Sequence, residues 1–345
     1  MKIKLITAVC VSFVVILFGI AIGSVYIPPG DVLAVIAYRA GSLFGMQAAE
    51  NMDINATTLA IVWNMRLPRT LLAFIVGAAL SVSGAVMQSV LRNPLASSFT
   101  LGVSSGASLG AAIVILFGVA LPVIAIFTLP LLCFLFGVAT IFIVIAFASR
   151  IDNRMENNTI ILTGMVFSLF INAITTLISA MARQYIQRLV FWQMGSFSGR
   201  GWDAIYILAP VVVAGTIFIV RFNRELDMMT FGEEQARTMG VNLKRVKWTL
   251  LISSAALTGS AIAFAGIIGF VDLVAPHVVR RIFGSSHRYV IPLSALFGGS
   301  FMVVCDIVAR TVVPPGELPV GVVTALVGAP FFAYIYFSRK KARVG

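Results

Sequence analysis

The chain has 345 residues, of which 59% are hydrophobic and 11% are charged. This composition excludes a soluble globular protein, because several apolar runs exceed the roughly 20 residues that cross a bilayer, and it predicts a polytopic, all-helical membrane protein. The net charge of +12 does not indicate nucleic-acid binding, because membrane proteins concentrate Lys and Arg on their cytoplasmic side.

The first half of the chain predicts six membrane spans and one short interfacial helix. Lys2 and Lys4 precede the first apolar run, which is long for a signal peptide and lacks a clear small-x-small cleavage site, so we expect an uncleaved span. Pro28 and Pro29 end this span, and residues 31–40 predict a helix at the membrane surface. The six spans are expected at about 5–26, 69–91, 100–118, 123–148, 158–181 and 204–220.

Three glycines in the third predicted span, Gly102, Gly106 and Gly110, are spaced four residues apart. This spacing places them along one helix face, where a second helix can approach closely. We therefore expect them to be helix-packing residues.

Residues 221–247 form the one long charged segment between two apolar halves. The segment predicts a short helix, a turn and a second helix over Glu233–Met239, with Gly240 where a C-cap glycine would end it. Two interpretations stay open at this point. The segment is either a solvated, charged loop or an amphipathic hairpin held out to a cytoplasmic partner.

The second half begins with an apolar stretch, 248–279, that is too long for one span and short for two. Two crossings, the second short and broken near Gly269 or Pro276, place the basic tail Arg339–Arg343 on the same side as Lys2 and Lys4. Two further spans are expected at about 290–309 and 320–337. The prediction is one membrane domain, residues 1–345, with about ten spans, both termini cytoplasmic and 18 of the 25 Lys and Arg residues inside.

The residue types that carry chemistry are sparse. No P-loop, metal-ligand cluster or nucleophile constellation is present, so we expect no enzyme activity and no bound metal or cofactor. Cys10, Cys133 and Cys305 lie in apolar runs without CxxC spacing and are expected to be small core residues. His277 and His287 leave a metal pair open as an alternative. The scarcity of mid-span carboxylates argues against an ion-driven carrier and for an energy source on a partner.

Three arginines are predicted at the outer membrane face. Arg66 and Arg69 flank Leu67-Pro68 at the mouth of the second span, and Arg310 ends the ninth span. They are either snorkelling residues that mark helix ends or a rim of guanidinium groups for the carboxylates of a docking protein.

Motifs along nearly the whole chain, in the family's order, resemble the iron-siderophore and cobalamin importer permeases of the FecCD-type family. The matching stretches are Arg66–Arg69, Gly77–Gln88, Asn93–Ala96, Leu101–Ala107, Trp192–Ser196, Gly232–Val241, Gly266–Arg280, Asp306–Arg310 and Glu317–Gly321.

The resemblance implies a type II ABC importer permease fold of ten helices, working as a dimer with two cytoplasmic ATPase subunits that carry ATP and Mg. It also implies an extracytoplasmic binding protein, whose glutamates would pair with Arg66, Arg69 and Arg310. Residues 221–247 would be the coupling segment, with the ATPase contacts Gly232, Glu233, Glu234, Ala236, Arg237, Gly240 and Val241. The cytoplasmic gate would contain Asn93, Pro94 and Leu95, with Asn158 and Thr159 as a second, less distinctive segment.

The predicted function is import of a bulky metal chelate across the bacterial cytoplasmic membrane, with a ferric siderophore favoured. Cobalamin and haem are the alternatives within the family. A self-sufficient secondary carrier is the alternative from another class. The sequence does not decide between a homodimer and a heterodimer.

Overall fold

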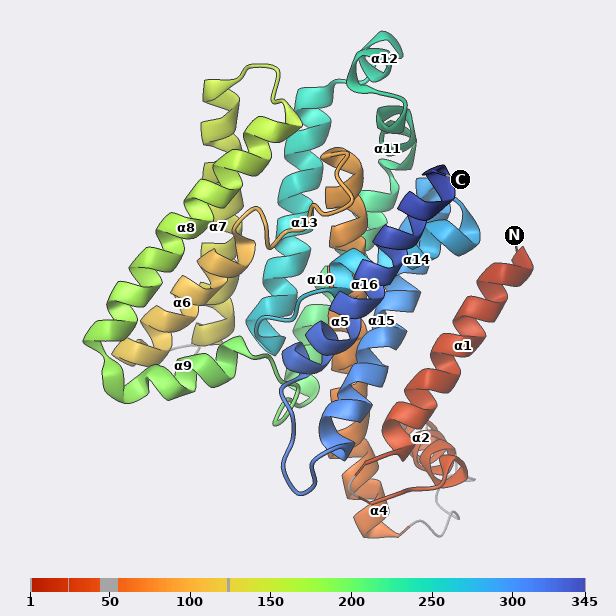
Figure 1. Cartoon of the computed structure of the whole chain (residues 1–345). Helices are drawn as coiled ribbons and strands as arrows, with labels where there is room; N and C mark the ends of the chain where they lie inside the picture. Colours follow the sequence, from red (N-terminus) through yellow and green to blue (C-terminus); the bar gives the residue numbers. More distant parts are fainter. Residues whose placement is uncertain (1, 24, 44–54, 123–124, 345) are drawn as a thin grey trace.

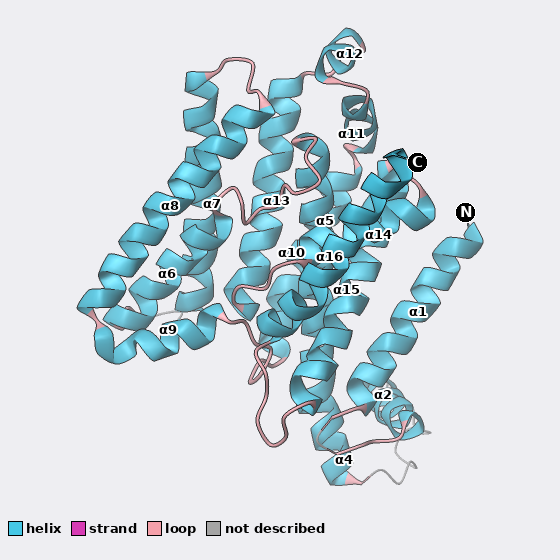
Figure 2. Ribbon diagram, viewed as in Figure 1, coloured by secondary structure: helices cyan, strands magenta, loops and turns pink. Residues whose placement is uncertain are grey.

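The computed structural model describes residues 2–23, 25–43, 55–122 and 125–344. The polar stretch 44–54, the predicted start of the fourth span at 123–124, and the side chains of Lys2 and of the basic tail lie outside the described part. Over the described ranges the chain forms helices, turns and loops, without strands (Figure 2).

The helices follow one another as α1 (Lys2–Ala21), α2 (Pro29–Leu43), α4 (Ala56–Ala60), a π-helical turn (Ile61–Arg66), α5 (Leu67–Val90), α6 (Val103–Phe117), α7 (Thr128–Ile151), α8 (Asn157–Met181), α9 (Ile186–Gln193), α10 (Trp202–Val220), α11 (Asn223–Thr230), α12 (Glu233–Thr238), α13 (Leu243–Ala265), α14 (Val271–Phe283), α15 (His287–Thr311) and α16 (Val320–Val344). Single turns of 3-10 helix at Ala125–Phe127 and Arg183–Tyr185 precede α7 and α9.

Seven helical stretches of the described chain are long and apolar enough to cross a membrane. They are Ile3–Ala21, Ala56–Val90, Ala125–Ile151, Asn157–Met181, Trp202–Val220, Leu243–Ala265 and His287–Thr311. The apolar helices α6 and α16 are shorter over their described residues, and α14 has 13 residues. A polytopic, all-helical membrane protein is thus confirmed, whereas the count of ten spans and the side of the termini stay predictions.

The helices alternate in direction through the molecule (Figure 1). Both labelled termini lie at the end that also carries α11 and α12, which we call the α12 end; α4 and α9 lie at the opposite, α9 end. α1, α6, α8, α13 and α15 lead away from the α12 end, and α5, α7, α10, α14 and α16 lead back to it. This order is the up-and-down arrangement that two crossings within 248–279 require.

α5 lies at the centre, packed against α13, α14 and α15, and its stretch is the most buried of the seven. Small residues let the backbones meet. A Cβ on Gly77 would lie 2.3 Å from the carbonyl oxygen of Gly298 on α15, and a Cβ on Gly84 would lie 1.9 Å from the carbonyl oxygen of Asp272 on α14. Helices packed this closely in a membrane are held by van der Waals contact.

The glycines of the third predicted span divide into two kinds. Gly106 and Gly110 face α7, where added Cβ atoms would lie 2.5 Å from Phe136 O and 2.6 Å from Leu132 O. Gly102 does not lie in a helix, because α6 begins only at Val103. It is the N-cap residue, with a left-handed φ of +90°. The expectation of a span from residue 100 is therefore wrong by about one turn.

The stretch 248–279 is broken, as predicted, near Gly269: α13 ends at Ala265 and α14 begins at Val271. At the start of this break the carbonyl of the buried Ala265 is paired within the protein, since Ser196 N–H donates to Ala265 O at 2.8 Å. Non-helical backbone at membrane depth is tolerated only where it is buried in protein in this way.

Two further expectations need correction. The helical stretch containing the second span begins at Ala56, not near Arg69, because α4, the π-helical turn and α5 run on without a break. Cys10 is exposed on the peripheral helix α1, whereas Cys133 and Cys305 are buried as expected. The apolar run did not distinguish an exposed cysteine from a buried one, because a side chain that faces lipid also lies in an apolar medium.

Candidate functional site

The predicted hairpin at 221–247 forms α11 and α12, and its last turn is closed by glycine. Gly240 has a φ of +89°, its N–H donates to Arg237 O at 2.9 Å, and Val241 N–H donates to Ala236 O at 3.0 Å. These two bonds make a Schellman motif, with Ala236 and Val241 buried beneath it. The predicted C-cap is therefore present for the physical reason given: only glycine takes this backbone conformation without strain.

The other predicted coupling residues lie around this cap. Gly232 precedes α12 with a φ of +128°, and Glu234 and Arg237 are exposed. Phe231 and Met239 at the two ends of α12 are also exposed, so α12 presents apolar and charged groups together. A surface of this mixed kind suits a protein partner better than bulk solvent.

The first predicted gate segment follows α5 in a tight turn. Arg92 has a left-handed φ of +47°, and the side chain of Asn93 accepts a hydrogen bond from Leu95 N–H at 2.9 Å. Further along, Ser98 lies 2.7 Å from Ser83 on α5 and 3.0 Å from Thr258 on α13, oxygen to oxygen. The link between α5 and α6 is thus folded locally and anchored in the helix bundle.

The structure brings the two predicted gate segments and the coupling segment to one place. A polar cavity of about 470 Å³ is lined by Leu91–Pro94, by Glu156–Asn158 and by Glu233. Leu95 and Thr159, also predicted for the gate, are not among its lining residues; Leu95 is exposed and Thr159 half-buried. The sequence predicted these segments separately, and their proximity is a result of tertiary packing.

Lys247 is the residue at this site that sequence reasoning missed. Its side chain is 0% exposed, and its Nζ atom lies 2.6 Å from Met155 O, 2.9 Å from Asn157 Oδ1 and 2.8 Å from Glu233 Oε1. The available signal was a lysine in the second turn of α13, between Val246 and Trp248 at the edge of an apolar helix. A charged side chain in that setting requires partners.

The link between α7 and α8, which provides Met155 O and leads into Asn157, is held by Asp152. The Asp152 carboxylate accepts hydrogen bonds from Glu156 N–H at 2.6 Å and Arg154 N–H at 2.8 Å. These backbone donors stabilise the ionised form and so lower the pKa of Asp152.

A second polar chain connects the hairpin to the end of α5. Asp227 on α11 lies 2.6 Å from His287 Nδ1, and His287 Nε2 lies 2.6 Å from Ser89 Oγ on α5. Arg280 on α14 donates to Ser89 Oγ at 3.1 Å. His277 instead stacks edge-on against Phe332, with ring centroids 5.5 Å apart. The two histidines considered as a metal pair thus have separate surroundings, and no cluster of three or more His, Cys, Asp or Glu side chains suited to a metal occurs in the described chain.

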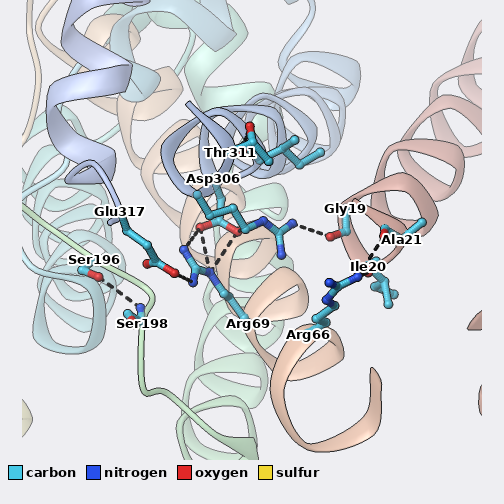
Figure 3. Close-up of polar contacts among 12 residues, drawn as sticks. Gly19, Ile20, Ala21, Arg66, Arg69, Ser196, Ser198, Asp306, Thr311 and Glu317 are labelled. Atoms are coloured by element: carbon cyan, nitrogen blue, oxygen red, sulfur yellow. Dashed lines mark hydrogen bonds and ion pairs between the residues drawn. The ribbon is translucent and has the colours of Figure 1, made fainter. Parts of the chain in front are cut away.

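At the opposite end, the three predicted docking arginines are paired within the chain; Figure 3 labels Arg66 and Arg69. Arg66 and Arg310 are only 8% and 6% exposed. Arg66 Nη1 donates to Ile20 O at 3.2 Å and to Ala21 O at 2.9 Å, and Arg310 donates to Gly19 O. These carbonyls belong to the last turn of α1, where backbone acceptors lack helical partners and a cation is favourable.

Arg69 bridges two carboxylates. Its Nη2 atom lies 2.8 Å from Asp306 Oδ1, and its Nη1 atom lies 2.7 Å from Glu317 Oε1 (Figure 3). Asp306 also lies 3.6 Å from Arg310 Nε, close enough for an ion pair although too far for a hydrogen bond. In this structure the three guanidinium groups contact acceptors of the chain itself. A docking role for the three arginines stays a prediction.

The exposed face of α8 carries polar residues far from the helix ends. Asn172 and Thr176 are exposed among large apolar side chains such as Leu169 and Phe170. An exposed amide in the middle of a membrane helix is costly in lipid, so this face is expected to meet protein or a water-filled path.

Comparison with known proteins identifies similar chains over nearly the whole length. The profile of the FecCD transport family matches residues 11–338. The uncharacterized ABC transporter permease protein YvrB of Bacillus subtilis (strain 168) is 43% identical over 320 residues, which cover 93% of this chain and 89% of that protein. The cobalamin import system permease protein BtuC of Halobacterium salinarum is 38% identical over 305 residues, covering 88% and 79%.

The fold is also found among solved structures. One of them is an inward-facing conformation of an ABC transporter provisionally classed as metal-chelate type. It aligns with a TM-score of 0.84 at 26% identity and covers 98% of this chain and 100% of that one.

Proposed function

Because this chain belongs to the FecCD transport family, we propose that it is the permease subunit of an ABC importer that moves a bulky metal chelate across the bacterial cytoplasmic membrane. The single observation that carries this proposal is the shared cavity of Leu91–Pro94, Glu156–Asn158 and Glu233. In this cavity the residues proposed for the gate lie beside Glu233 of α12, which supports a motor protein acting on the gate through the hairpin.

In the proposed mechanism, α12 contacts a cytoplasmic ATPase subunit, which binds ATP and Mg. The mixed surface of Phe231, Glu234, Arg237 and Met239 supports this contact, and the Schellman cap holds α12 in one orientation. Closure of the two ATPase subunits on each other would displace α12 and change the shape of the cavity that Glu233 lines. The chain itself would carry out no covalent chemistry, and each partner shifts the permease only by its differential affinity for the two conformations.

A second permease subunit would cover the exposed polar face of α8. Asn172 and Thr176 support this placement, because a face shared between two subunits can line a path for a polar solute while remaining shielded from lipid. A homodimer would bring two identical α8 faces together about a twofold axis, and a heterodimer would pair this face with that of a related chain.

The extracytoplasmic binding protein would dock at the α9 end. Of the three predicted arginines, Arg69 is the best placed. Its partner Glu317 is 37% exposed, so a carboxylate of the binding protein could replace it without unfolding the helix ends. Arg66 and Arg310 would reach a partner only if the end of α1 moved.

The test is uptake by proteoliposomes that contain the permease, its genome-neighbour ATPase and the matching binding protein. We expect ATP-dependent accumulation of a ferric siderophore that requires the binding protein, with cobalamin and haem as the other arms of the panel. Accumulation by the permease alone, driven by an ion gradient without nucleotide hydrolysis, would replace this proposal with a secondary carrier.

A further inference from the structure

The Lys247 ammonium is fully enclosed and fully satisfied. A lysine has three N–H donors, and Met155 O, Asn157 Oδ1 and Glu233 Oε1 accept one each at 2.6, 2.9 and 2.8 Å. The carboxylate of Glu233 also compensates the buried charge. Such a group has no spare donor, so movement of any one acceptor must move Lys247 or break a charge-assisted hydrogen bond.

The three acceptors belong to two separate parts of the chain: α12, and the junction of α7 with α8. Glu233 is the first residue of α12, Asn157 is the first residue of α8, and Met155 lies in the link between α7 and α8. Lys247 itself extends from the second turn of α13. One nitrogen atom therefore connects the helix that would contact the ATPase with the helix whose polar face would meet the second subunit.

The acceptor side of this connection is stiff. Met155 has a left-handed φ of +51°, an uncommon conformation for a residue with a side chain, and the carboxylate of Asp152 ties the N–H groups of Arg154 and Glu156 on either side. A stiff link transmits a displacement rather than absorbing it. On the other side, residues 239–242 join α12 to α13 through the Schellman cap, so a displacement of α12 would carry Glu233 with it.

We propose that Lys247 is the positioning residue that transmits displacement of α12 to the start of α8 and thereby to the cytoplasmic opening. This inference rests on the proposed function, since it requires an ATPase acting on α12. Glu233 and Asn157 both line the cavity that Leu91–Pro94 also line. A change in the distance between Glu233 and Asn157 would therefore change the shape of this cavity.

The first experiment measures ATP hydrolysis and substrate uptake in the same proteoliposomes containing the assembled complex. In Lys247→Met the apolar stem is kept and the ammonium is lost. We expect hydrolysis to stay within about twofold of wild type while uptake per ATP falls about tenfold, the range over which single residues alter coupling. Lys4→Met is the matched control, because Lys4 is an exposed lysine in the first turn of α1, and this helix begins at the same α12 end (Figure 1).

Glu233→Gln is the second variant, and it decides the question if Lys247→Met does not assemble. The Glu233 side chain is 22% exposed and tolerates substitution more readily than the enclosed lysine. Glutamine keeps an acceptor but removes the compensating charge, so we expect a smaller loss of uptake per ATP in the same direction. Uptake per ATP equal to wild type in this variant would overturn the proposal.

A second readout separates transmission from simple structural support. Asn158 is exposed at the start of α8 and lines the cavity. The alkylation rate of Asn158→Cys therefore measures how accessible the cavity is, and Cys10→Ser removes the other exposed thiol of the described chain. We expect this rate to change between the nucleotide-free and vanadate-trapped complex when Lys247 is present. The change should disappear in Lys247→Met although ATP is still hydrolysed.

Two outcomes would overturn the assignment. The first is a change in alkylation rate in Lys247→Met that equals the change in the complex with Lys247. The second is a parallel loss of hydrolysis and uptake in an intact complex, which would indicate that Lys247 gives structural support only. Failure of the underlying function gives a different result. In that case the complex with wild-type Lys247 shows no ATP-dependent uptake at all.

Discussion

The Arg69 guanidinium and the Asp306 carboxylate form a buried ion pair between α5 and α15, with Nη2 and Nε 2.8 and 3.0 Å from the same oxygen, Oδ1. Asp306 also faces Arg310, so one carboxylate compensates two cations at the α9 end. Arg310 in turn donates to Gly19 O at the end of α1. This arrangement explains why residues predicted to face a partner are found inside the molecule.

Asp306→Asn is expected to destabilise the protein strongly. The substitution leaves Arg69 and Arg310 buried without their shared counter-charge, a change that typically costs about 3–5 kcal/mol. The measurement is unfolding of the purified protein in detergent, followed by thermal aggregation or denaturant titration. Glu317→Gln is the control. Glu317 is partly exposed, so its loss should cost at most about 1 kcal/mol. An equal loss of stability in both variants would show that Asp306 is not the main counter-charge for the arginines at the α9 end.

Docking of the binding protein is expected to depend on Arg69 more than on Arg66. Arg69→Ala should weaken docking by about 10- to 100-fold, the loss typical of a charged hydrogen-bonding partner at an interface. Arg66→Ala should lower thermal stability, because Ile20 O and Ala21 O in the last turn of α1 lose their guanidinium donor, while the affinity of the correctly folded fraction changes little. Both quantities are measured on the same detergent preparations. Normal docking by Arg69→Ala would exclude the proposed role of this residue.

Gly240→Val is expected to disrupt attachment of the ATPase. The position has a φ of +89°, which a β-branched residue does not adopt without strain, and both bonds of the Schellman motif depend on this conformation. The penalty of about 1–2 kcal/mol should appear as reduced co-purification of the ATPase and reduced uptake per ATP. Gly30→Ala on α2 is the matched control, since a Cβ at Gly30 meets no atom within 4 Å. Full co-purification with Gly240→Val would argue that the ATPase contacts another surface.

Gly77→Val is expected to separate α5 from α15. The new Cβ would lie 2.3 Å from Gly298 O and 2.6 Å from Met302 Cβ, so backbone must shift, at a cost of about 1–3 kcal/mol. Thermal unfolding in detergent measures the loss. Gly201→Ala adds a methyl group in open space and should leave the unfolding temperature unchanged. A wild-type unfolding temperature for Gly77→Val would mean that the contact between the two helices is looser than described.

The elements that were predicted correctly depend on short stretches of sequence. An apolar run long enough to cross a membrane is visible without any knowledge of its neighbours, and so is a glycine placed at the end of a charged helix, as at Gly240. The break between α13 and α14 could be located near Gly269 because 32 apolar residues cannot form one comfortable span. The start of the second span was placed too late, because the helical stretch begins at Ala56 and continues into α5 through a π-helical turn.

The partners of the three arginines and of Lys247 could not be predicted from short stretches of sequence. A guanidinium group near a span end has the same local sequence whether it points toward a partner protein or caps a neighbouring helix. Arg310 and Gly19 O are 291 positions apart in the chain, and Lys247 and Met155 O are 92 apart. The sequence of a single helix does not specify contacts between residues so far apart in the chain.

The sequence by itself determined that this is an all-helical membrane protein of the FecCD transport family, with a glycine-capped hairpin between two apolar halves. Those properties follow from hydrophobic length, charge distribution and backbone preference, which act over a few turns of helix. Only the tertiary structure decided which acceptor each buried cation meets and that gate and hairpin share one cavity. A buried charge must find its counter-charge among whatever helices surround it, and helix packing alone sets those neighbours.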